Sequence, residues 1–292
     1  MSELGQYLGN GLVLGAIYAL MAAGLTLVFG YMGVVNFAHG EFYMIGAYLA
    51  YTVTSILGWP FAVGVLFAAL GAAVLGLLIN WGILQPLRKY ETLEMPMLAT
   101  IGLAIMLPNV AIILWNPVPK AAGSPVPAAS IDLGIMRLSS ASLFVIGMAL
   151  LFILCSHLFI NRTRAGLTMR GTFQDSTASW LMGVNVTRVY ALTFVFGAVL
   201  AALSGVLIAT IFNITPAMGT LATAKSFVVV ILGGLGSFPG AVAGGLLLGL
   251  VEGLGAGYIS AGYKDTFGLL VLILVLLLRP QGLFGAKRMV QE

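Results

Sequence analysis

The sequence predicts an all-α polytopic membrane protein, and three observations lead to this fold class. Of its 292 residues, 60% are hydrophobic and only 8% are charged, and the mean hydropathy is +1.08. A soluble domain carries about 25% charged residues, so most of this chain must face lipid or other protein. Its apolar residues form long unbroken blocks, without the period-two alternation of a membrane β-barrel. We therefore expect about eight to nine transmembrane helices, some of them broken or re-entrant.

The apolar blocks predict these helices in order along the chain. They cover residues 7–30, 42–57, 60–85, 95–115, 139–161, 189–212, 226–235, 239–258 and 266–279. The block at 226–235 and the start of the block at 42–57 are too short for ordinary spans, which need about 20 residues. We expect one transmembrane domain over residues 1–292, with an external loop at about 116–138 and a cytoplasmic loop at about 162–188.

The basic residues predict the orientation, because Arg and Lys favour the cytoplasmic side of a membrane. They lie mostly between the blocks, which is typical of membrane orientation and not of nucleic acid binding. The larger group then lies inside: Arg88, Lys89, Arg162, Arg164, Arg170, Arg188, Arg279, Lys287 and Arg288. Four remain outside: Lys120, Arg137, Lys225 and Lys264. This places the N-terminus outside and the C-terminus in the cytoplasm, in the plasma membrane.

The stretch VVNFAHGEF, residues 34–42, places polar side chains in apolar surroundings. A buried carboxylate or unsatisfied backbone costs several kcal/mol in hydrocarbon, so it persists only inside a bundle or beside water. One interpretation is a broken helix that lines or gates a pathway. The other is a short cytoplasmic turn, and residue types alone favour neither. The candidate residues are Asn36, Phe37, His39, Gly40 and Glu41.

A second stretch, GGLGSFPG, interrupts a later apolar run in a similar way. Paired breaks of this kind in two halves of a transporter point to discontinuous helices around a central pathway. The similarity between the two stretches is loose and gives weak support for a duplicated fold. The candidate residues here are Gly233, Gly234, Gly236, Ser237, Pro239 and Gly240.

A further carboxylate, Glu252, lies beside a series of glycines that recur every fourth residue. Glycines at 245, 249, 253 and 257 form a stripe that permits very close helix packing. Glu252 should therefore face protein, and its role is open.

The sequence offers no catalytic motif with supporting context. GTLATAKS at 219–226 resembles a phosphate-binding loop but lacks its second glycine and a preceding strand. Two histidines and one cysteine do not compose an ordinary metal site. We expect no catalytic residue, no metal and no cofactor bound by this chain.

The cytoplasmic loop contains QDSTASWLMGVN, which predicts a short amphipathic helix with Gly183 and Asn185 as its stop. Such a helix could dock in a groove on a soluble partner or lie on the surface without one. Spacing and charge favour neither alternative.

Several segments together resemble the LivH-type permeases of branched-chain amino-acid ABC importers. They include GAIYALMAAGLTLVFGYMGVVNFAHGEF, SWLMGVNVTRVYALTFVFGAVLAALSGVL, ILGGLGSFPGAVAGGLLLGLVEGL and LLRPQGLFG, in the same order over nearly the whole chain. The resemblance implies the permease fold of an ABC importer and a transport subunit that is not an enzyme. It also makes the two helix breaks candidates for lining the pathway, with Gly40 and Asn36 serving backbone shape and capping.

The resemblance further implies the partners. These are a LivM-type second permease subunit, two cytoplasmic ATP-binding subunits that hydrolyse ATP, and an extracytoplasmic substrate-binding protein. The solute implied is leucine, isoleucine or valine. The residues expected to couple the chain to the ATPase are Gln174, Asp175, Ala178, Leu181, Met182, Gly183 and Asn185.

Three alternatives stay open at this point. The same class of importer could carry urea, short amides or other small neutral amino acids. A secondary transporter could use Glu41, His39 or Glu252 as a proton site. An intramembrane enzyme would need Glu41, Glu252 and His157 close together.

Overall fold

The computed structural model describes residues 3–88, 94–132, 134 and 136–285. Lys89, Lys287 and Arg288, which enter the orientation prediction, lie outside these ranges. The described helices that precede the external loop are α1 (Glu3–Met32), α2 (His39–Tyr51), η1 (Thr52–Ile56), α3 (Phe61–Ile79), η2 (Asn80–Leu84), α4 (Gln85–Leu87) and α5 (Glu94–Trp115). Those that follow it are α6 (Ser140–Arg162), α7 (Arg164–Gln174), α8 (Ser176–Leu181), α9 (Val186–Ala209), α10 (Met218–Gly233), α11 (Phe238–Tyr258), η4 (Ala261–Tyr263) and α12 (Lys264–Leu278).

The helices confirm the predicted fold class. Among the described residues, 7 helices are long and apolar enough to cross a membrane, and α10 is a shorter apolar helix. The predicted short segments correspond to α10 and to α2, which has only 13 residues. The loop predicted to be external contains the antiparallel strands β1 (Ser130–Asp132) and β2 (Arg137–Ser139). The Asp132 carboxylate accepts a hydrogen bond from Gly134 N–H at 2.9 Å, which favours the turn between the strands.

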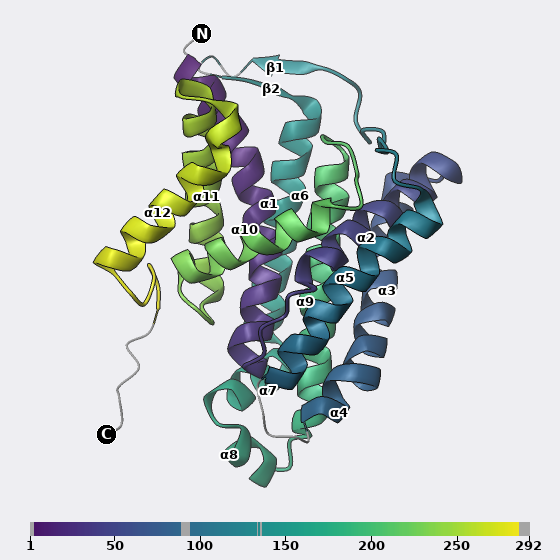
Figure 1. Cartoon of the computed structure of the whole chain (residues 1–292), viewed down its shortest axis with the longest axis vertical. Coiled ribbons are helices and arrows are strands. Elements are labelled where there is room, and N and C mark those ends of the chain that lie inside the picture. The colour runs from purple at the N-terminus through teal and green to yellow at the C-terminus, as the bar shows by residue number, and fades with distance from the viewer. Residues whose placement is uncertain (1–2, 89–93, 133, 135, 286–292) are drawn as a thin grey trace.

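Two long helices, α1 and α9, form the centre of the bundle. In each of them 78% of the most apolar window is buried, against 28% in α3 and in α6, 22% in α5 and 6% in α12. The outer helices therefore carry the apolar surface available to lipid or to partner chains. Figure 1 shows α1 and α9 running the length of the molecule, with α10 crossing in front of them.

Close packing of α1 on α11 uses the predicted glycine stripe. A methyl group added to Gly249 would collide with the backbone of Gly15, and one added to Gly253 would come within 2.6 Å of the Gly11 Cα. Helices in lipid associate through such close contacts because lipid is as apolar as their side chains. The stripe thus joins the first long helix to one near the end of the chain.

The two ends of the bundle carry different features (Figure 1). The start of α1 and the β1–β2 hairpin lie at one end, whereas α7 and α8 lie at the other. A hydrogen bond from Arg137 N–H to the Gln6 side chain, 3.3 Å long, joins the hairpin to α1. The loop predicted to be external and the loop predicted to be cytoplasmic are therefore at opposite ends.

Candidate functional site

The first helix break lies inside the protein. The chain leaves α1 at Met32, turns at Gly33 with φ 66°, and re-enters a helix at His39. Asn36, His39 and Glu41 are buried, with relative exposures of 1%, 0% and 0%. These values favour a buried helix break over a water-facing turn.

Two threonines from other helices satisfy the backbone of this break. The N–H of Phe37 donates to Thr100 Oγ1 of α5 at 3.2 Å, and the N–H of Gly40 donates to Thr223 Oγ1 of α10 at 2.9 Å. Asn36 Oδ1 accepts from Ala38 N–H at 3.0 Å. Non-helical backbone at membrane depth is tolerated only with such partners, so α5 and α10 hold the break in place.

The two ionisable residues of the break have different surroundings. His39 Nε2 lies 3.0 Å from the Met21 carbonyl oxygen, which can only accept, so Nε2 carries a proton. Glu41 lies against the first turn of α10, since a methyl group added to Gly219 would collide with its carboxylate. The positive end of the α10 dipole faces the Glu41 side chain, which is fully buried.

Gly40 has a different function from the expected one. Its φ is not positive, so backbone shape does not require glycine here. A Cβ at Gly40 would instead collide with the Gly219 carbonyl oxygen and with Thr223. Gly40 therefore allows α2 and α10 to approach closely, while Asn36 closes the turn before α2.

The second break joins α10 to α11. Gly234 and Gly236 have φ values of 104° and 82°, a region that favours glycine. Ser237 caps α11 by accepting a hydrogen bond from Gly240 N–H at 3.1 Å. A Cβ on Gly233 would collide with the Gly240 carbonyl, so these two glycines pack face to face.

The chain after α12 completes the second break. Leu283 N–H donates to the Leu232 carbonyl and Phe284 N–H donates to the Gly233 carbonyl, both at 2.9 Å. These bonds satisfy the last carbonyls of α10, which otherwise lack partners. The segment LLRPQGLFG therefore has a structural role that sequence reasoning missed.

The structure does not bring the two breaks together. They lie at opposite ends of α10, where the separation of 14 residues between Gly219 and Gly233 corresponds to about 21 Å of helix. Glu41 lies at the first break and His157 lines a cleft of about 240 Å³ at the second. Glu252 packs in neither place, so the cluster required by an intramembrane enzyme is not formed by these residues. The lining of a translocation pathway by these two breaks stays a prediction.

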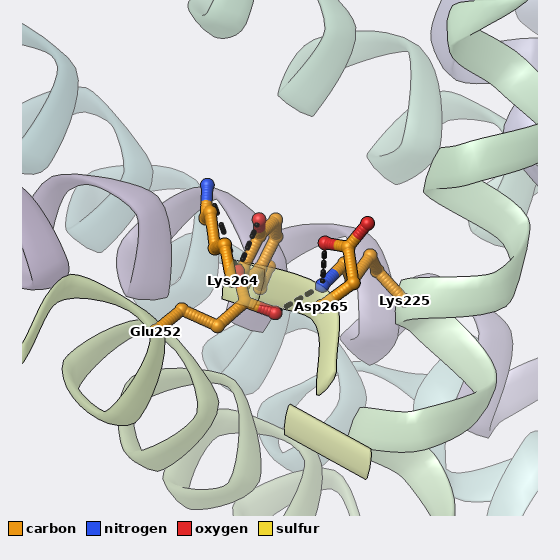
Figure 2. Close-up of polar contacts among 5 residues, drawn as sticks. Lys225, Glu252, Lys264 and Asp265 are labelled. Atoms are coloured by element: carbon orange, nitrogen blue, oxygen red, sulfur yellow. Dashed lines mark hydrogen bonds and ion pairs between the residues drawn. The ribbon is translucent and has the colours of Figure 1, made fainter. Parts of the chain in front are cut away.

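A charged cluster of Tyr18, Lys225, Glu252, Lys264 and Asp265 joins four helices (Figure 2). Lys225 Nζ is in close contact with Glu252 Oε1 and lies 2.7 Å from Asp265 Oδ1. Glu252 is fully buried, as predicted, and its Oε2 accepts a hydrogen bond from Tyr18 at 3.0 Å. Lys264 lies 3.6 Å from the same oxygen.

This cluster places Lys225 inside a helix. The apolar blocks predict a helix that begins after it, at residue 226, whereas it lies in α10, which begins at Met218, and its side chain is only 15% exposed. The two lysines balance the two carboxylates, which lowers the cost of burying Glu252 in a membrane-spanning helix.

The loop between α6 and α9 forms two helices, α7 and α8. Asp175 caps α8 by accepting from Ala178 N–H at 2.8 Å, and Gly183 ends this segment with φ 84°. Asn185 is not part of the helix stop, because its side chain accepts from Arg188 N–H and caps α9. All seven predicted coupling residues are exposed: Gln174, Asp175, Ala178, Leu181, Met182, Gly183 and Asn185.

The end of α8 presents large apolar side chains to solvent. Trp180, Leu181 and Met182 are 67%, 72% and 84% exposed. Trp180 was missed by sequence reasoning, although an aromatic residue beside Leu181 and Met182 could have indicated it. Exposed apolar groups at the tip of a loop are typical of an interaction surface.

α7 connects this tip to the bundle. The Phe173 ring lies 5.2 Å from the ring of Tyr31, near the end of α1. A Cβ on Gly236 would be 3.5 Å from the same Phe173 ring. The α7–α8 segment therefore contacts both the end of α1 and the second break.

Comparison with known proteins gives consistent similarities. The family described as "Branched-chain amino acid transport system / permease component" matches residues 7–277. The chain is 38% identical to the high-affinity branched-chain amino acid transport system permease protein BraD of Pseudomonas aeruginosa, covering 96% of this chain and 95% of that protein. It is 37% identical to the corresponding permease LivH of Escherichia coli strain K12, with the same coverages.

A weaker similarity extends to a second permease protein named for high-affinity branched-chain amino acid transport. The chain is 26% identical to the permease protein LivM of Salmonella typhimurium, covering 93% of this chain and 68% of that protein.

Proposed function

The chain belongs to the family of permease components of branched-chain amino acid transport systems, and on this premise we propose that it forms half of the membrane pathway of an ATP-driven importer for leucine, isoleucine and valine. The similarity to permeases named for this transport, over 96% of the chain, is the observation that carries the proposal. The alternative is an importer of the same class that carries urea, short amides or other small neutral amino acids. An apolar bundle suits neutral or zwitterionic solutes, because an unpaired ion loses its hydration.

The second half of the pathway is a LivM-type permease subunit. The sequence similarity between this chain and LivM supports two related halves that pack against each other. The outer helices α3, α5, α6 and α12 provide apolar surface for such packing and for lipid. Each half then contributes its own pair of helix breaks, and the buried break at Asn36–Glu41 is the region of this chain that we assign to the pathway.

ATP is hydrolysed by two separate cytoplasmic subunits, and this chain binds no cofactor of its own. The exposed side chains of Trp180, Leu181 and Met182 support docking of α8 into an apolar groove on one of these subunits. Movement of α8 would reach the second break and the end of α1 through Phe173, which contacts Tyr31. The N-terminus and the β1–β2 hairpin then face outward, toward a substrate-binding protein, and the C-terminus faces the cytoplasm of a plasma-membrane importer.

Reconstitution into liposomes tests the function. The chain is purified with its LivM-type partner, the two ATP-binding subunits and the binding protein, and uptake of labelled leucine is measured with and without ATP. We expect accumulation only in the complete set with ATP, and competition by unlabelled isoleucine and valine but not by urea or short amides. Accumulation of leucine by this chain alone, driven by a proton gradient, would instead establish a secondary transporter.

Substitution at the tip of α8 tests the coupling contact. Leu181→Asp and Met182→Asp should abolish binding of the ATP-binding subunits and ATP-driven uptake, because burying a carboxylate in an apolar groove is costly. Leu154→Asn, at an exposed position in the middle of α6, serves as the control for a change on an apolar surface away from the tip. Normal pull-down of the ATP-binding subunits by both tip variants would refute the docking assignment.

A further inference from the structure

A groove of about 800 Å³ runs between α3 and α9 and is separate from both helix breaks and from the tip of α8. Its walls are largely apolar and include Leu77, Leu192 and Val195. Val74 and Trp81, which also line it, are 59% and 58% exposed, so the groove is open to the surroundings of the bundle. Its volume is within the range of about 300–1,000 Å³ that small-molecule sites occupy.

The polar residues of the groove gather at one end. Gln85 lies just beyond the π-helical turn of η2, and Asn185 and Arg188 lie at the start of α9, next to α8. No carboxylate is among the lining residues. Arg188 is exposed and belongs to none of the ion pairs within the described residues. Among the described residues, the groove thus ends in a cation that lacks an acidic partner.

A second guanidinium, which is not among the residues that line the groove, packs against the first turns of α9. Arg88 immediately follows α4, and its guanidinium carbon lies 4.4 Å from the ring centre of Tyr190, two residues after Arg188. Neither Nε nor Nη2 of Arg88 has a hydrogen-bond partner in the part of the chain that the structure describes. The potential at this end of the groove is therefore positive, whereas the remainder is apolar.

The length of the groove matches one leaflet of a bilayer. The separation of seven residues between Arg188 and Val195 on α9 corresponds to about 10 Å, and the separation of twelve residues between Ala73 and Gln85 corresponds to about 18 Å. Half of a hydrocarbon core is about 15 Å thick. Trp81 lies near the charged end, where aromatic residues are enriched at the membrane–water boundary.

We propose that this groove binds an anionic phospholipid from the leaflet on the α8 side, with its phosphate at Arg188 and its acyl chains along Leu77, Leu192 and Val195. Basic pockets between membrane helices bind lipid phosphates by this combination of charge and apolar surface. The unpaired Arg188 favours an anionic lipid over a neutral lipid. It also favours lipid over an apolar helix of a partner subunit, which would leave that charge unpaired.

Trp81 offers a native probe for the test, because it lines the groove. The intact importer complex is placed in phosphatidylcholine nanodiscs, and a small fraction of the lipid is replaced by brominated phosphatidylglycerol or brominated phosphatidylcholine, whose acyl chains quench nearby tryptophan. The Trp81 signal is the difference between the unaltered complex and Trp81→Phe. We expect about fivefold stronger association of the anionic lipid, as about 1 kcal/mol for one cation implies.

Arg188→Gln should make the two lipids quench equally, and Arg188→Lys should keep most of the preference. Arg162→Gln is the matched control, because Arg162 is an exposed arginine in the last turn of α6 that does not line the groove. Equal quenching by both lipids in the unaltered complex, or a preference that Arg188→Gln leaves intact, would overturn the proposal.

One further result would overturn it in favour of another occupant. Absence of Trp81 quenching by either lipid would show that protein covers the groove.

Discussion

The pairing of Lys225 with Glu252 can be tested quantitatively by a double-mutant cycle. Lys225→Met removes the cation that contacts the fully buried Glu252. Removing one partner of a buried ion pair costs about 3–5 kcal/mol because the other charge is left uncompensated. Glu252 keeps the Tyr18 hydroxyl at 3.0 Å and the more distant Lys264 at 3.6 Å. We therefore expect Lys225→Met to lower the free energy of unfolding by about 3 kcal/mol, the lower end of that range.

Substitution of the other partner, Glu252, should lower the free energy of unfolding by less. In Glu252→Gln, Lys225 keeps its contact with Asp265 at 2.7 Å, and the glutamine can still accept from Tyr18. The loss of charge-assisted hydrogen bonds then costs about 2 kcal/mol. In the double variant no buried charge is left unpaired, so its cost should not exceed that of Lys225→Met alone. The coupling energy is then at least about 2 kcal/mol.

The assay is equilibrium unfolding of the purified permease in mixed detergent micelles, with the free energy of unfolding determined for the four proteins. The exposed pair of Asp132 and Arg137, whose side chains are 46% and 61% exposed, is the control. Its coupling should not exceed about 1 kcal/mol. If the loss of unfolding free energy in the double variant equals the sum of the two single losses within about 0.5 kcal/mol, the assignment of a buried ion pair is refuted.

Two further predictions follow from glycines. Gly40→Val should destabilise the protein by about 1–3 kcal/mol, because the added side chain separates α2 from α10. Thermal unfolding measures this loss. The control is Gly102→Val, which should have little effect because a Cβ at Gly102 meets nothing within 4 Å. Equal losses for both would contradict the close-contact explanation. Gly183→Ala should weaken binding of the ATP-binding subunits in pull-down, because a non-glycine residue at φ 84° costs about 1–2 kcal/mol. Gly171→Ala in α7 should leave binding intact, and a weakening as large as that of Gly183→Ala would argue against a backbone effect at the end of α8.

The helices could be predicted from the sequence because lipid imposes one simple requirement on them, a long apolar run. The same requirement fails at Lys225. Hydropathy predicts a helix that begins after this residue, whereas α10 begins at Met218 and includes the less apolar turns before it. A lysine is tolerated there because Glu252, 27 residues away, neutralises it. Hydropathy carries no information about such a pairing.

The candidate site was predictable to a similar extent. The polar residues of VVNFAHGEF indicated a break, but its burial depends on Thr100 and Thr223, which come from distant helices and form no local pattern. The role of Gly40 was mistaken for the same reason, since its neighbour Gly219 lies far along the chain. The last turn of α10 likewise depends on Leu283 and Phe284. Local patterns indicate where a helix stops but not which distant residues complete it.

The packing of α1 on α11 has a consequence for the order in which the protein can be made. Tyr18 and Glu252, which hydrogen-bond across this contact, are 234 residues apart. At about 5–20 residues per second, a ribosome needs roughly 12–50 s to synthesise that interval. During this time α1 resides in the membrane without its main partner, which its apolar surface permits. The glycine faces of both helices stay unpaired until α11 has inserted, so final assembly of the bundle must follow synthesis of α11.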